Sequence, residues 1–105
     1  MKAGTKTPLV GDIQNKVLIE FAKRLGITPM ELIERNKRND ICDMRYLYFK
    51  LRFENHGVNY MAIGREIGRS RVTVKYGIDR INNILHTNQK EVVAKWDKVK
   101  DIPIE

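Results

Sequence analysis

The residues with the clearest chemical meaning are basic, and they gather in the middle of the chain. Residues 35–80 carry eleven Lys or Arg and five Asp or Glu, a sum of +6, whereas residues 1–34 sum to +1 and residues 81–105 to zero. Guanidinium and ammonium groups concentrated in this way bind phosphate oxygens. The distribution therefore favours a polyanionic partner, with nucleic acid first and an anionic membrane surface second.

Two short stretches hold most of these charges. Residues 35–40 contain no apolar side chain, so we expect a basic loop that presents Arg35, Lys37 and Arg38. The second stretch follows Gly68, and its candidates for contacts in the major groove of DNA are Arg69, Ser70, Arg71, Val72, Thr73 and Lys75. Arginine pairs bidentately with guanine, and an apolar side chain can contact the methyl group of thymine.

The sequence gives little indication of a disulfide, a zinc site, an ATP site or a membrane span. One cysteine, Cys42, excludes an internal disulfide and favours a cytoplasmic protein. One cysteine and two histidines cannot supply a four-ligand zinc cage, and no Gly-x-x-x-x-Gly-Lys-Ser/Thr cradle for ATP is present. The longest apolar runs, such as residues 46–49, have four residues, far below the ~20 residues of a membrane span. We expect no catalytic residues, no cofactor and no metal.

The elements that must position the basic residues are predicted to be helices. Apolar residues recur at helical spacing between residues 12 and 100, and no window alternates as a strand does. The expected fold is all-α with five or six helices. A chain of 105 residues suits one domain, which we place at residues 12–100, with a flexible N-terminal segment at 1–11 and a C-terminal tail at 101–105.

Helix starts are marked by side chains that can accept from free backbone N–H groups. The expected N-caps are Asp12, Thr28 (in a capping box with Glu31), Asp40, Asn59 and Ser70. Gly26 is the expected end of the first helix, because glycine tolerates the left-handed conformation.

Residues 60–81 have the layout of a helix-turn-helix. A short helix ends at Ile67, Gly68 opens a tight turn, and a longer helix follows with a core-facing stripe that begins at Val74. This stripe leaves Val72 and Tyr76 pointing away from the core. An ordinary αα-hairpin has the same periodicity, and the concentration of charge in residues 35–80 favours DNA binding over it.

Residues 68–74, Gly-Arg-Ser-Arg-Val-Thr-Val, resemble the signature Gly-Arg-Asp-His-Thr/Ser-Thr-Val of the C-terminal DNA-binding domain of the bacterial replication initiator DnaA. The other matching segments keep the family's order: Asp12–Phe21, Ile27–Leu32, Arg35–Arg38, Arg45 and Ile63–Gly64. The resemblance spans residues 12–100 and implies a Trp-repressor-like fold, with the signature helix in the major groove and the basic loop in the adjacent minor groove.

The resemblance also implies roles for single residues. Lys37 takes the place of the family's minor-groove arginine, while Ser70, Arg71 and Val72 take the places of the base-reading Asp, His and Thr. Arg69 and Thr73 match the signature. Further candidates for phosphate contacts are Arg45, Asn59 and Tyr60. Because the base-reading positions differ, we expect a target sequence other than the initiator's own box.

The expected function is sequence-specific binding of double-stranded DNA, in replication initiation or in transcriptional regulation. The family's ATPase domain has no counterpart in these 105 residues, so we expect neither ATP binding nor enzymatic activity. The protein would be nucleoid-associated and a monomer or weak homodimer. The alternative is a helical adaptor that docks on an acidic replication or regulatory protein.

Overall fold

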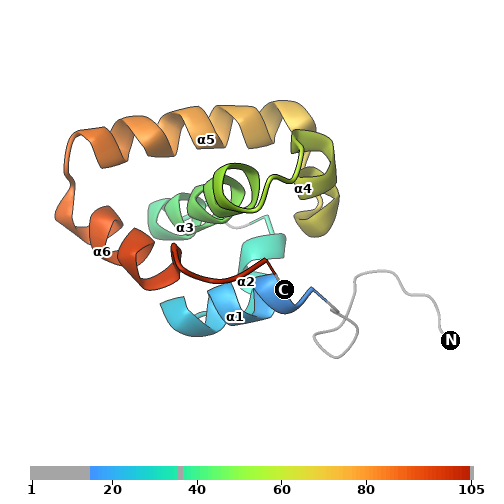
Figure 1. Cartoon of the computed structure of the whole chain (residues 1–105), viewed down its shortest axis with the longest axis horizontal. Coiled ribbons are helices and arrows are strands. Elements are labelled where there is room, and N and C mark those ends of the chain that lie inside the picture. The colour runs from blue at the N-terminus through green and yellow to red at the C-terminus, as the bar shows by residue number, and fades with distance from the viewer. Residues whose placement is uncertain (1–14, 36, 105) are drawn as a thin grey trace, which may run out of the picture.

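The computed structural model describes residues 15–35 and 37–104, and within these ranges it contains helices and no strand (Figure 1). The elements are α1 (Lys16–Leu25), α2 (Pro29–Ile33), α3 (Asn39–Lys50), the π-helical turn η2 (Leu51–Asn55), α4 (Tyr60–Ile67), α5 (Arg71–His86) and α6 (Lys90–Val99). The predicted all-α fold is confirmed. The segment predicted to be flexible, residues 1–11, lies outside the described residues.

Helix α3 forms the centre of the molecule and packs against α2, α5 and α6 (Figure 1). Its Leu47, Tyr48 and Phe49 are completely buried. Helix α5 approaches α3 closely at Gly77, where a Cβ atom would lie only 2.5 Å from the ring of Tyr46. The missing side chain at Gly77 therefore lets α5 lie directly on the core.

Local capping signals set most of the helix starts as predicted. Thr28 and Glu31 form the reciprocal capping box of α2, and Asn59 and Ser70 cap α4 and α5 through bonds to the N–H groups of Ala62 and Thr73. Each cap satisfies a backbone donor that the helix itself leaves free.

Two expected caps are wrong. The N-cap of α1 is Asn15, whose side chain accepts from the Leu18 N–H, rather than Asp12, which lies outside the described residues. Helix α3 begins at Asn39, so Asp40 lies within its first turn instead of capping it. The Asp40 carboxylate is held by the side chain of Arg38, at distances of 3.2 and 2.7 Å.

The C-terminal segment adds to the core, although the sequence predicts a tail at residues 101–105. Ile102 is only 4% exposed and belongs to the buried apolar cluster. Its carbonyl lies 2.8 Å from Nε2 of His56. The segment after α6 therefore contributes to the fold.

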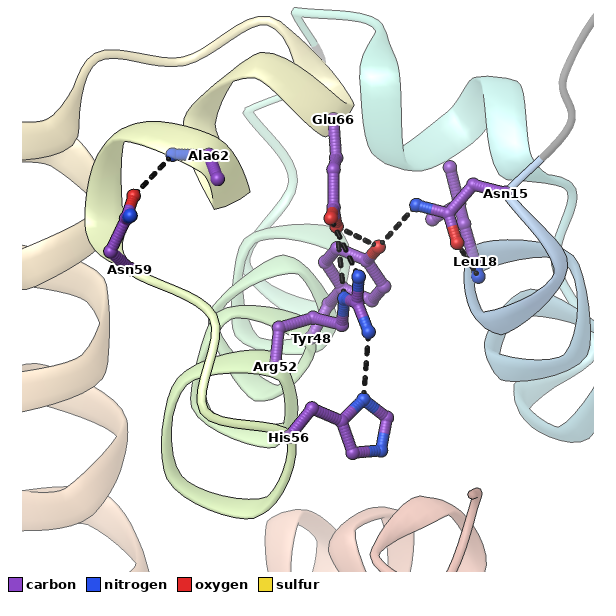
Figure 2. A network of polar contacts seen from close by, with 8 residues as sticks. All are labelled: Asn15, Leu18, Tyr48, Arg52, His56, Asn59, Ala62 and Glu66. Atoms are coloured by element: carbon purple, nitrogen blue, oxygen red, sulfur yellow. Dashed lines mark hydrogen bonds and ion pairs between the residues drawn. The ribbon is translucent and has the colours of Figure 1, made fainter. Parts of the chain in front are cut away.

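A polar network joins Asn15, just before α1, to Glu66 on α4 and reaches His56 (Figure 2), which extends it to the Ile102 carbonyl after α6. The Tyr48 hydroxyl donates to the Glu66 carboxylate and accepts from the Asn15 amide, and Arg52 binds both carboxylate oxygens of Glu66. Arg52 also donates to Nδ1 of His56, 2.8 Å away. Since an arginine can only donate, the His56 imidazole accepts at Nδ1 and carries its proton on Nε2, which bonds the Ile102 carbonyl.

Candidate nucleic-acid interface

Helices α4 and α5 meet in a tight turn of residues 68–70. Gly68 has φ +72°, which is the left-handed conformation that glycine adopts without a steric penalty. Gly64 lies so close to the turn that a Cβ atom there would be 2.1 Å from the carbonyl oxygen of Arg69. Small residues at these two positions bring the start of α5 against the end of α4, as a helix-turn-helix requires.

The first turn of α5 presents a mixed outer face. Arg71 and Lys75 are exposed, and Val72 is 71% exposed. Ser70 is partly committed to the backbone, because its Oγ accepts from the Thr73 N–H at 3.2 Å and lies 3.0 Å from the Thr73 hydroxyl. Of these predicted base-reading side chains, Arg71 and Val72 are therefore the most available to a ligand.

Lys75 is exposed but does not present an unshielded charge. Its ammonium group donates to the Asp79 carboxylate at 3.0 Å, one helical turn further along α5. This hydrogen bond raises the pKa of Lys75 above its ordinary value. Asp79 therefore offsets part of the positive charge on this face.

The Arg69 guanidinium is bound to backbone carbonyls, in place of the predicted contact in the major groove of DNA. Its Nη1 donates to the carbonyls of Ile33, Ile67 and Gly68 at 3.0, 2.9 and 3.3 Å, and its Nη2 donates to the Glu34 carbonyl at 2.9 Å. Four backbone acceptors converge on this guanidinium, because the C-terminal ends of α2 and α4 meet there. Burial, with the nearby charges of Arg45 and Arg35, lowers the pKa of Arg69.

Arg45 is also directed inward, so its expected role as a phosphate contact is wrong for this conformation. The residue is only 5% exposed. Its guanidinium donates to the carbonyls of Leu32 and Glu34 at 2.8 and 3.0 Å. Bonds to otherwise unpaired helix-end carbonyls explain why a charged side chain is buried here.

Arg45 and Arg69 together form what we call the arginine clamp, defined by their shared bonds to the C-terminal carbonyls of α2. The basic loop leaves α2 at this point, so the clamp holds the start of the loop against the turn before α5. Arg35 and Lys37 are exposed on the loop, and Arg38 is exposed but binds Asp40. The structure thus places the start of the basic loop beside the turn before α5, although Arg35 and Arg69 are 34 residues apart in the sequence.

The two remaining predicted contacts lie at the start of α4. The side chain of Asn59 is engaged as the N-cap, 2.8 Å from the Ala62 N–H (Figure 2). The Tyr60 ring stacks on Phe53 with a centroid distance of 4.5 Å. Tyr60 also lines a groove beside the outer face of α5, so it lies near the proposed interface.

One residue at this surface is not among the predicted contacts. Tyr76 is 57% exposed and stands on the outer face of α5, one turn after Val72. The helical periodicity indicates its direction, but aromatic residues at helical spacing are usually buried, so this signal alone does not assign it to binding. The ring contacts Tyr46 edge-on, with a centroid distance of 6.2 Å.

Within residues 15–35 and 37–104, no cluster of three His, Cys, Asp or Glu side chains could hold a metal ion. No helix in the same ranges is long and apolar enough to cross a membrane. Comparison with protein-family models, with curated proteins and with solved structures found no match.

Proposed function

We propose that this chain binds double-stranded DNA as a DnaA C-terminal-like helix-turn-helix domain, with α5 in the major groove and the basic loop at the adjacent minor groove. The observation that carries the proposal is the arginine clamp. It holds the start of the basic loop, at Glu34 and exposed Arg35, beside the turn from which exposed Arg71 begins α5. Two basic elements at a fixed separation suit the repeating phosphates of a duplex.

In this proposal, some side chains contribute mainly to affinity and others mainly to sequence specificity. Arg35 and Lys37 neutralise phosphates, so binding weakens steeply as salt concentration rises. Arg71 can donate two parallel hydrogen bonds to guanine, and its loss should cost about 1–3 kcal/mol at one base pair. A domain of this kind would act at the nucleoid, in replication initiation or in transcriptional regulation.

Selection of bound duplexes from random DNA, followed by anisotropy titrations over a range of salt, tests the proposal. We expect Arg71→Ala to relax the preference at one position, and Arg35→Ala to weaken binding to all sequences and to lower the salt slope by about one. Lys98→Ala is the matched control, since α6 lies at the other end of the molecule from the α4–α5 turn (Figure 1).

Two results would contradict the proposal. The first is the absence of duplex binding at low salt. The second is binding that Arg35→Ala and Lys98→Ala weaken equally, because that would reflect net charge alone. Binding to an acidic protein in the absence of any duplex binding would favour the adaptor alternative.

A further inference from the structure

We propose that Val72 and Tyr76 form an apolar ridge that contacts the 5-methyl groups of pyrimidines, so that the chain selects sites containing thymine beside a guanine. This inference rests on the proposed DNA-binding function and specifies the base chemistry that α5 would read. We call these two side chains the Val72–Tyr76 ridge.

The first observation is exposure. Val72 is 71% and Tyr76 57% exposed, and they lie four residues apart on the outer face of α5. The large apolar side chains exposed within residues 15–35 and 37–104 are Ile19, Met61, Val72, Tyr76 and Ile104. Two of them therefore share one turn of one helix, and an exposed apolar pair on an otherwise polar face is typical of a contact surface.

The second observation is shape. A groove of about 470 Å³ borders both residues and has Tyr60 of α4 on its far side, and a second hollow of about 310 Å³ begins at Tyr76 and follows α5 toward its C-terminus. Tyr76 and Asp79 line both hollows, so the exposed Tyr76 ring lies between them. Its ring is supported edge-on by Tyr46, which is itself half-buried under α5. A supported projection enters a groove with little loss of side-chain freedom.

The third observation is charge, and it points to DNA as the occupant of this surface. Arg71 and Lys75 line the same groove as the ridge. Asp79, which pairs with Lys75, also lines it, so Arg71 supplies the net positive charge of this groove. The edges of the bases in the major groove offer one apolar group, the C5-methyl of thymine, to which 5-methylcytosine adds its own. An apolar ridge beside a net positive charge matches a methyl group in a groove whose edges carry phosphates.

The spacing of the two side chains limits the target. Four residues of α-helix advance about 6 Å along the axis, and successive base pairs are separated by about 3.4 Å. The ridge therefore spans at most about two base-pair steps. With Arg71 adjacent to Val72, we expect a guanine and one or two thymines within about three consecutive base pairs.

Removal of single methyl groups from a selected duplex tests this inference. Each thymine is replaced in turn by deoxyuridine, which deletes only the methyl group. Burial of one methyl-sized group is worth about fourfold in affinity, so one or two replacements should weaken binding by that factor. Replacing the same thymine by 5-methylcytosine, paired with guanine, should retain more affinity than replacing it by cytosine.

Protein variants assign the effect to the ridge. The affinity of Val72→Ala for the thymine duplex should equal the affinity of the wild type for the duplex with one deoxyuridine, and the same is expected of Tyr76→Ala. In each variant, replacing that thymine by deoxyuridine should cause no further loss of affinity. Ile19→Ala is the control, because it removes an exposed apolar side chain from α1 instead of α5. It should leave both affinities unchanged.

The failures of the two proposals are distinguishable. If salt-dependent duplex binding persists but no deoxyuridine replacement changes affinity, the ridge does not read methyl groups and the proposed function stands. If Val72→Ala weakens the thymine and deoxyuridine duplexes equally, the methyl contact is also refuted. If no duplex is bound at all, the proposed function and this inference fall together.

Discussion

Replacing Arg69 by lysine tests the role that the structure gives to the arginine clamp. Lysine keeps the positive charge, so the change leaves the net charge at +7. A single ammonium group, however, cannot occupy the positions of both guanidinium nitrogens that bond the Ile33, Ile67, Gly68 and Glu34 carbonyls. Arg69→Lys therefore separates the geometry of the clamp from its charge.

The size of the effect follows from these bonds. We expect the ammonium group of the Arg69→Lys variant to leave about two of the charge-assisted hydrogen bonds unmade, each worth about 1–1.5 kcal/mol where water has partial access. The free energy of unfolding should fall by about 2–3 kcal/mol, and the melting midpoint by about 10–20 °C for a domain of this size. Urea denaturation and thermal melting of the variant and the wild type, followed by far-ultraviolet circular dichroism, measure the two quantities.

The proposed DNA binding supplies the second readout, measured well below both melting midpoints. Because the charge is retained, the salt dependence of binding should not change. Affinity for a selected site should fall roughly tenfold, since the basic loop is no longer held at one distance from α5 and must be ordered on binding.

Arg71→Lys is the matched control for stability. Arg71 is exposed on α5, so this change should leave the unfolding free energy within about 0.5 kcal/mol of the wild type. The reasoning is refuted if Arg69→Lys also leaves the free energy of unfolding unchanged. It is also refuted if Arg69→Lys lowers the salt slope, because that result would assign Arg69 to a phosphate.

Three further predictions concern the turn, the polar network and the outer face of α5. Gly64→Ala should destabilise the domain by about 1–3 kcal/mol in thermal unfolding, because its Cβ would meet a backbone carbonyl; an unchanged melting midpoint would contradict the close contact. Tyr48→Phe should cost about 1–3 kcal/mol by leaving Glu66 without one donor. Burial and the Glu66 charge raise the pKa of Tyr48, so its stabilisation is complete below pH ~10 and declines above it; denaturation of both proteins across this range should show the difference shrinking, and a difference that grows would refute the sign. Asp79→Asn should release Lys75 for phosphate and strengthen duplex binding at low salt with a steeper salt slope; weaker binding would instead assign Asp79 to a base contact.

The features that the sequence predicted correctly are those with local causes. The N-caps at Thr28, Asn59 and Ser70 each depend on a partner three residues away, and the core stripe of α5 follows from helical spacing. These interactions need no knowledge of the tertiary fold, so the all-α architecture and the position of the helix-turn-helix could be predicted.

The features that were missed depend on distant segments. The inward direction of Arg69 is set by carbonyls at positions 33 and 34, more than 30 residues earlier in the chain. Burial of Ile102 similarly depends on contacts that the fold creates, including the one with His56. A matching motif could place Arg69 at the turn but could not indicate where its guanidinium points.

The polar network around Glu66 also affects the order in which parts of the domain unfold. Terminal segments ordinarily fray before the rest of a fold opens. Here Asn15, next to the start of α1, and Ile102, after α6, are linked through Tyr48, Arg52 and His56 to one carboxylate on α4. Detachment of either end breaks hydrogen bonds of this network, so we expect local opening there to be coupled to loosening of α4. Amide hydrogens near both ends should therefore exchange with solvent almost as slowly as those of the core, as one cooperative unit.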